Sequence, residues 1–134
     1  MLDFDYELIV SQTIQAVLGV GRQVINDQSV HYDRIGIKLS AHTVLIDVDE
    51  NTDEIRISAT DNEKFAADEV VFSDIPELNA CVGKELGWCW EGTNSQGYQD
   101  TFSISVSGIE PDYCFVGIAS ALQLNKISKI VSKE

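Results

Sequence analysis

Basic residues are scarce in this chain, which has 9 lysines and arginines against 22 aspartates and glutamates, for a net charge of −13. The imbalance lies before Thr101, because residues 1–100 hold 19 acids and 6 bases (6 − 19 = −13) and residues 101–134 hold 3 of each. Binding to nucleic-acid phosphates or anionic membranes normally needs clustered lysine and arginine. Lys126, Lys129 and Lys133 are too few for a cluster, so we expect no nucleic-acid binding and no membrane binding.

Long apolar runs and disulfide patterns are also missing. The longest stretch without a charged residue, residues 8–21, has 14 residues, whereas a membrane-spanning helix needs about 20 apolar residues. Three cysteines, Cys81, Cys89 and Cys114, are odd in number and widely spaced, which does not match a disulfide framework. The first residues are acidic, unlike the basic start of a secretory signal. We therefore expect a cytoplasmic protein with reduced thiols.

Catalytic and metal-binding motifs are not recognisable. The only histidines are His31 and His42, and no pattern brings either one to a cysteine as a nucleophile and its base would require. The histidines and cysteines also lack the close spacing of a zinc site. Gly19 and Gly21 lack both the third glycine and the lysine of nucleotide-binding loops. We expect no cofactor and no metal, and favour a non-catalytic protein over an enzyme.

The apolar residues are sufficient for a core. They make up 44% of 134 residues, close to the average for globular proteins, and the length matches one ordinary domain. The chain has only two prolines and no internal repeat or linker that would divide it. We expect a single domain over residues 1–134.

Alternating apolar and polar residues predict several strands. In residues 33–59, three alternating stretches are joined by links of a few residues, which favours an antiparallel three-stranded meander. The same alternation, or a run of apolar residues, predicts five further strands, at residues 13–20, 70–72, 86–90, 101–107 and 113–119.

Two short helices are expected. Asp3 can cap a helix over residues 3–11, and Pro76 suits the first turn of a helix over residues 73–82. Residues 60–69 are polar and are expected to form a loop. Two segments, residues 12–25 and 121–131, fit either strand or helix. The predicted fold is α+β, a predominantly antiparallel β-sheet of seven or eight strands, rolled or open, with two short helices.

The segment 47–54 is rich in acids, with five carboxylates and no base. Four of its residues follow the first ligand spacings of an EF-hand calcium loop: Asp47, Asp49, Asn51 and Asp53. Thr52 stands where that loop needs glycine, and Ser58 where it needs a bidentate glutamate. The flanks also resemble strands rather than helices. A solvated hairpin turn is the favoured interpretation.

The segment 87–100 holds both tryptophans. Six of its residues are candidates for a binding patch: Trp88, Trp90, Asn94, Gln96, Tyr98 and Asp100. Tryptophan and tyrosine dominate binding hot spots because they bury large areas at a small entropic cost. The competing interpretation places both tryptophans on the inner face of a strand, as core anchors. Residues 94–98 would then be a hairpin turn, with Gly97 at a positive φ.

Two passages resemble a family of short bacterial proteins of unknown function. One is Asn51-Thr52-Asp53-Glu54-Ile55, and the other is the tryptophan strand 87–90 followed by the Asn-x-Gln-Gly-Tyr-x-Asp turn of residues 94–100. The resemblance covers residues 13–127. It implies a bacterial cytosolic protein that stands alone, and it implies that the turn at 94–100 matters, without suggesting an activity.

The leading functional hypothesis is a non-catalytic protein-binding module of the immunity or antitoxin kind, which engages a basic partner. Opposite charges accelerate such an encounter. Its contact candidates are the polar turn at 94–100 and the acids Asp47, Asp49 and Asp53. One alternative is a small enzyme or ligand-binding domain with a pocket near Trp88, Tyr98 and Asp100. Another is a homo-oligomeric structural protein.

Overall fold

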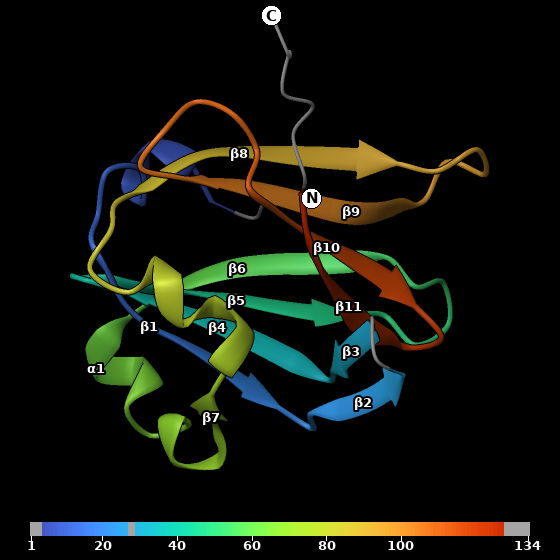
Figure 1. Ribbon diagram of the computed structural model, residues 1–134, viewed down its shortest axis with the longest axis horizontal. Coiled ribbons are helices and arrows are strands. Elements are labelled where there is room, and N and C mark those ends of the chain that lie inside the picture. The colour runs from blue at the N-terminus through green and yellow to red at the C-terminus, as the bar shows by residue number, and fades with distance from the viewer. Residues whose placement is uncertain (1–3, 27–28, 128–134) are drawn as a thin grey trace, which may run out of the picture.

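The protein is built from two antiparallel β-sheets that face each other across a shared core (Figure 1). The structure is a computed structural model and describes residues 4–26 and 29–127. It contains eleven strands and four short helical turns in these residues. The expectation of a mostly antiparallel sheet with few helices is confirmed, but the strands form two sheets and outnumber the seven or eight that we expected.

The first sheet has five strands in the order β6-β5-β4-β1-β7. Their bounds are β1 Ile14–Val20, β4 Arg34–Leu39, β5 His42–Val48, β6 Ile55–Asp61 and β7 Ser73–Asp74. Neighbours β4, β5 and β6 pair antiparallel through short turns, which confirms the meander predicted for residues 33–59. The strand predicted at 13–20 is β1, and it pairs with β4.

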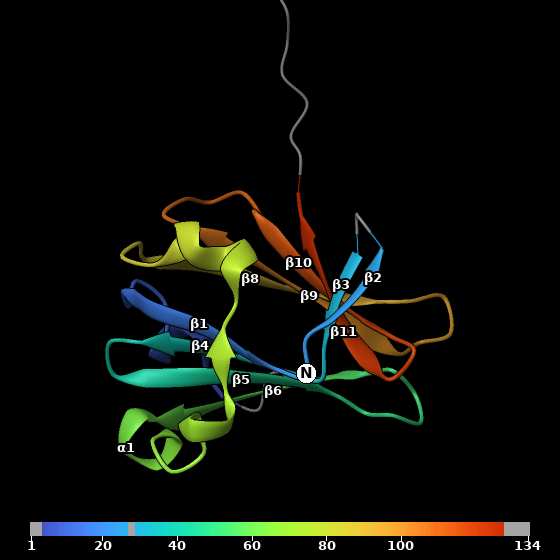
Figure 2. The ribbon, with the colours of Figure 1, turned by 60° about the horizontal axis from the view of Figure 1, so that its bottom comes forward.

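The second sheet has six strands in the order β2-β3-β11-β10-β9-β8. Their bounds are β2 Gln23–Asn26, β3 Ser29–Tyr32, β8 Leu86–Thr93, β9 Gln99–Val106, β10 Tyr113–Ile118 and β11 Ala121–Lys126. Figure 2 shows β10, β11 and β3 lying together in this sheet, above the first sheet. The strands predicted at 86–90, 101–107 and 113–119 are β8, β9 and β10.

Both sheets turn their apolar faces to one core. The first sheet contributes residues such as Ile35, Ile37 and Ile46, and the second contributes Phe102 and Phe115, all of them buried. The rings of Phe102 and Phe115 stack with centroids 6.4 Å apart. A smaller cluster of Leu18, Phe65 and Phe72 lies apart from this main core.

The helical segments differ from the predictions. The helix expected over 3–11 is a single 3₁₀ turn, η1 (Tyr6–Leu8), and the one expected over 73–82 is the 3₁₀ segment η3 (Pro76–Cys81). The strand expected at 70–72 is wrong, since η2 (Glu69–Val71) is a 3₁₀ turn there. The loop expected at 60–69 contains a short helix, α1 (Asn62–Phe65), whose Phe65 anchors the smaller apolar cluster.

The two segments whose patterns fit either strand or helix, 12–25 and 121–131, form strands in the residues that the structure describes. Residues 121–126 are strand β11, and the rest of that segment beyond Ile127 lies outside the described residues. The segment 12–25 holds β1 and most of β2, so it is strand and not helix. Strand β3 lies in a region for which the sequence predicted no strand, and it joins β2 to the second sheet because it pairs with both β2 and β11. No helix within residues 4–26 and 29–127 is long and apolar enough to span a bilayer.

Candidate functional site: the acidic turn and the tryptophan strand

The turn between β5 and β6 is docked onto two other turns. Asp53 Oδ1 accepts a hydrogen bond of 2.8 Å from the backbone N–H of Ser120, between β10 and β11. Glu54 Oε2 accepts one of 3.3 Å from the backbone N–H of Gln99, at the start of β9. Neither Asp53 nor Glu54 is fully exposed. These two carboxylates therefore hold three turns together, at the right-hand end of the molecule in Figure 1.

Backbone packing beneath this turn is close. A side-chain carbon added at Gly117 of β10 would overlap the backbone carbonyl oxygen of Asp53. Glycine is therefore required where the acidic turn lies against β10. Ser120 adds a hydrogen bond of 3.1 Å from its Oγ to the carbonyl oxygen of Glu50.

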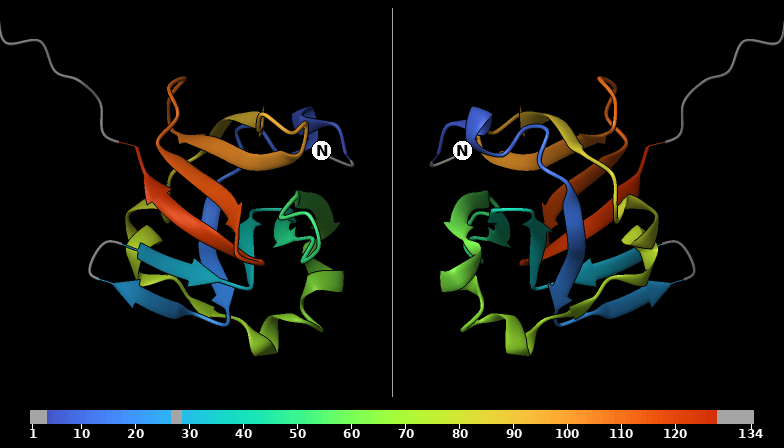
Figure 3. Two further views of the ribbon diagram at one scale, coloured as in Figure 1. Left: turned by 90° about the vertical axis from the view of Figure 1, so that its right-hand side faces the viewer. Right: turned by 90° about the vertical axis from the view of Figure 1, so that its left-hand side faces the viewer.

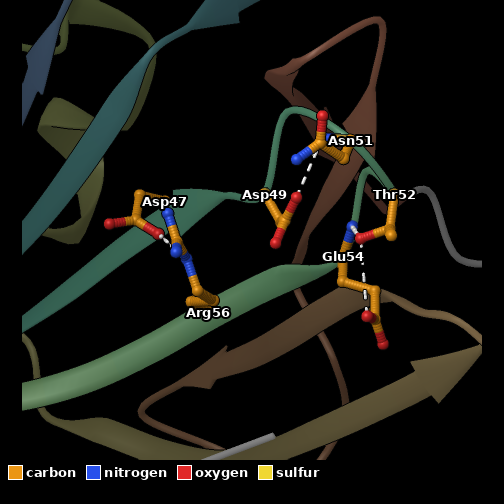
Figure 4. Close-up of polar contacts among 6 residues, drawn as sticks. All are labelled: Asp47, Asp49, Asn51, Thr52, Glu54 and Arg56. Atoms are coloured by element: carbon orange, nitrogen blue, oxygen red, sulfur yellow. Dashed lines mark hydrogen bonds and ion pairs between the residues drawn. The ribbon is translucent and has the colours of Figure 1, made fainter.

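The remaining acids of this turn point in different directions (Figure 4). Asp47 forms an ion pair of 2.9 Å with Arg56, and Asp49 Oδ1 accepts a hydrogen bond of 2.9 Å from the backbone N–H of Asn51. Among the described residues no group of three or more histidine, cysteine or acidic side chains converges as a metal site would require. The turn is not merely solvated either, because its carboxylates accept hydrogen bonds from the protein.

The turn between β8 and β9 forms as the sequence predicts. Asn94 Oδ1 accepts hydrogen bonds from the backbone N–H groups of Gln96 (2.9 Å) and Tyr98 (3.2 Å), and Gly97 has a φ of 88°. Asn94 Nδ2 also donates to Asp100 Oδ2 at 3.2 Å. Asn94 and Asp100 thus shape the turn, whereas the side chains of Gln96 and Tyr98 are exposed.

The tryptophans do not occupy the core. Trp88 is 52% exposed. Trp90 is half-buried and pairs with Ser103, between the buried Phe102 and Ile104, so it lies on the outer face of the sheet. Cys89 pairs with Ile104 instead and packs against the core. The interpretation of both tryptophans as inner anchors is wrong.

A β-bulge explains this arrangement. The register between β8 and β9 shifts between Leu86 and Cys89, so both of these residues face inward although three positions separate them. The backbone N–H of Trp88 donates to Ser105 Oγ at 2.7 Å, and Ser105 Oγ donates to the carbonyl oxygen of Gly108 at 2.7 Å. A side-chain carbon at Gly87 would overlap both of those oxygens.

The inward position of Cys89 affects its chemistry. Burial, with a smaller contribution from the charge of Glu91, raises the pKa of its thiol to about 12. Burial also raises the pKa of Cys81, although its hydrogen bond with Tyr113 opposes the shift. A thiol with a raised pKa carries little thiolate at neutral pH and is a poor nucleophile.

A hollow of about 270 Å³ lies between the bulge and the loop that follows β9. Its lining includes Trp88, Ile109 and Glu85, of which the last two were not candidates from the sequence. Ile109 is 75% exposed. An isolated isoleucine in a turn sequence carries no signal by itself, and only the fold places it beside Trp88.

The candidate residues therefore form two groups. The turn end, defined as residues 47–56, 94–100 and 119–120, unites the acidic turn with the polar hairpin turn. Trp88 lies near the other end of β8, about 20 Å from Asn94 at the usual rise per strand residue, so Trp88 does not share a site with Tyr98 and Asp100.

Comparison with known proteins gives one assignment. The chain belongs to a family of unknown function, DUF6334. The model of this family matches residues 1–131. This match fits the resemblance to a family of unknown function that the sequence suggested. The two short motifs that carried the resemblance stay a prediction. No curated protein and no solved structure matches the chain.

Proposed function

We propose that this protein is a non-catalytic binding module that engages a basic protein partner through its turn end. The observation that carries the proposal is the contact between Glu54 and Gln99, because it joins the acidic turn and the polar hairpin turn into one surface. The turn end contains six acids and one base, Arg56, so its formal charge is 1 − 6 = −5. Opposite charges of this size speed association and help to set the orientation of a complex.

The contacts within the turn end divide its residues by role. Asp53, Asn94 and Asp100 form hydrogen bonds that hold the turns in place. Glu50 is exposed, and its carboxylate forms no hydrogen bond or ion pair with the other described residues. The exposed side chains of Gln96 and Tyr98 lie on the neighbouring hairpin turn. Glu50 and Tyr98 are thus the contact residues that a variant can change without breaking the fold.

The experiment is affinity capture from the source cells, followed by binding measurements with each purified candidate. We expect a basic protein that binds at about 50 mM salt and elutes at about 500 mM, since the screening length falls severalfold across this range. Glu50→Lys should weaken binding about tenfold, or about 1.4 kcal/mol. Glu63→Lys on α1 changes the net charge equally at a distant exposed site and should have little effect.

Binding that ignores salt would refute the electrostatic basis of the proposal. Equal weakening by Glu50→Lys and Glu63→Lys would show that only net charge matters, and would remove the turn end as the contact surface. The enzyme or ligand-binding alternative has less support. The hollow beside Trp88 is lined by residues 107–109 and not by Tyr98 or Asp100, the polar groups expected to share it.

A further inference from the structure

The hollow beside Trp88 combines an apolar lining with one negative charge. Nine residues line it, and Glu85 is the only charged one among them. Val10 and Ile109 supply apolar surface together with the indole of Trp88. Glu85 is exposed, and no ion pair of its carboxylate is recorded among the described residues. The hollow therefore offers an aromatic ring and an available carboxylate at the same place.

The wall that holds Trp88 is built by specific contacts. Ser105 is fully buried and links the backbone of Trp88 to that of Gly108. This link connects β8 to the loop that carries Ile109, on the opposite side of the hollow. Bulges commonly redirect a side chain at functional positions. Here the bulge places a tryptophan in solvent at a cost in buried apolar area, which a binding role would explain.

The strand that carries Trp88 also lies at a sheet edge. Ser11 donates a hydrogen bond of 2.8 Å to the carbonyl oxygen of Leu86, so the N-terminal segment covers the start of β8. Beyond Gly87, no other strand of the described residues pairs with the outer edge of β8. A partner can thus approach Trp88 directly. In Figure 3 the β8–β9 pair lies at the top of the molecule, at its surface.

The size and the charge of the hollow together indicate which chemical group binds there. The hollow is slightly smaller than the roughly 300–1,000 Å³ of pockets that enclose whole ligands, so it suits one side chain. Arginine matches its chemistry, because the apolar stem can lie on Val10 and Ile109 while the guanidinium stacks on the indole and pairs with Glu85. Lys84 does not compete with the arginine for Glu85, since it lines a different hollow with Cys81 and Tyr113.

We propose that the Trp88 hollow binds an arginine side chain of the basic partner, stacked on the indole of Trp88 and paired with Glu85. This inference rests on the proposed function for the nature of the partner. It adds a second contact, near the opposite end of β8 from the turn end.

Three short peptides test the site, each with one central residue between glycines and blocked ends: arginine, lysine or citrulline. Citrulline has nearly the shape of arginine but carries no charge. The indole N–H signals of the two tryptophans report binding by NMR, and Trp90→Phe assigns them. We expect the arginine peptide to shift the Trp88 signal and to bind roughly fivefold more tightly than citrulline, as an exposed cation–π contact allows.

Variants of the full chain complete the test. Trp88→Leu keeps apolar bulk but removes the indole, and Glu85→Gln keeps shape but removes the charge. Each should weaken arginine-peptide binding roughly fivefold, and Glu63→Gln should not. Urea unfolding of each variant verifies that it is folded. Equal affinities for arginine and citrulline would overturn the site, and lysine binding as tightly as arginine would overturn the choice of a guanidinium.

The two proposals fail in different ways. If the arginine peptide shifts signals of Glu50 and Tyr98 but not that of Trp88, the turn end still attracts cations and only the hollow is wrong. If the Trp88 signal shifts while Glu50→Lys leaves partner binding unchanged, the hollow stands and the turn end loses its role.

Discussion

The acidic turn and the first half of β8 use their side chains in opposite ways. In the turn, carboxylates are partly buried and bind backbone N–H groups of distant segments, as Asp53 does with Ser120. In β8, the large apolar side chain of Trp88 is about half exposed, and the small Cys89 takes the inward position. The charged side chains of Asp53 and Glu54 thus stabilise the fold, whereas the apolar side chain of Trp88 is available for contacts. Residue type alone does not separate structural from functional surfaces here.

The largest expected effect concerns the packing under the acidic turn. Gly117→Ala should lower the free energy of unfolding by about 1–3 kcal/mol, the usual cost of overpacking, because the new methyl group overlaps the carbonyl oxygen of Asp53. Urea denaturation measures this loss. Gly108→Ala is the control, since its added carbon has only one neighbour, at 4.0 Å. Equal stability of the two variants would show that the turn is not docked on β10.

The next effect concerns the bulge that exposes Trp88. Ser105→Ala removes the acceptor of the Trp88 N–H and the donor to Gly108, both in a buried environment. Stability should fall by about 1–2 kcal/mol, and the fluorescence of Trp88 should change, measured in a Trp90→Phe background. Ser103→Ala, at a half-exposed position of the same strand, should change neither quantity. If the fluorescence spectrum of Trp88 is unaltered in Ser105→Ala, the bulge does not depend on Ser105.

The reactivity of Cys89 tests the register of β8 independently. In a variant that keeps only this cysteine, the thiol should react with iodoacetamide at pH 8 roughly 1,000-fold more slowly than in the unfolded chain, because its raised pKa of about 12 suppresses the thiolate. Fast modification would mean that Cys89 faces outward and Trp88 inward.

The raised pKa of the Cys89 thiol also makes the stability of the fold depend on pH. The unfolded chain loses the Cys89 proton near pH 9 while the folded chain keeps it until about pH 12. The stability that this thiol contributes is therefore complete below pH 9 and declines between pH 9 and pH 12. The check is denaturation of the single-cysteine variant and of the same variant with Cys89→Ser, from pH 9 to pH 12. The difference between their free energies of unfolding should shrink as the pH rises.

The smallest effect lies in the turn that receives Asp53. Ala119 and Ser120 have φ angles of 51° and 62°, in the left-handed region that favours glycine. Ala119→Gly should raise stability by less than about 1 kcal/mol, because relief of strain is offset by the greater entropy of the unfolded glycine. Urea denaturation checks the sign, and a loss of stability would show that Ala119 is not strained.

The strands were largely predictable because their signals are local. Alternation in residues 33–59 and at Phe102, Ile104 and Val106 is visible in short windows, and so are the turn residues Asn94 and Gly97. The hairpin turns keep neighbouring strands antiparallel. These features depend on residues close in the chain.

The missed features depend on distant contacts. Strand β3 forms against β11, which follows some 90 residues later, and the Asp53–Ser120 bond spans 67 residues. The bulge in β8 depends on Ser105 and Gly108, so the sequence Leu-Gly-Trp-Cys-Trp alone suggests regular alternation. Such alternation places Leu86, Trp88 and Trp90 on one face, and a one-residue shift reverses every later side chain.

The most direct test of the comparison is the stability of two variants, Asp53→Ala and Trp88→Gln, measured side by side in urea. Loss of the Asp53 acceptor should cost about 2 kcal/mol, while glutamine at the half-exposed Trp88 position should cost about 1 kcal/mol or less. The aspartate variant should therefore be the less stable of the two. A loss of about 4 kcal/mol or more in Trp88→Gln, with Asp53→Ala unchanged, would place the tryptophan in the core and the acids in solvent.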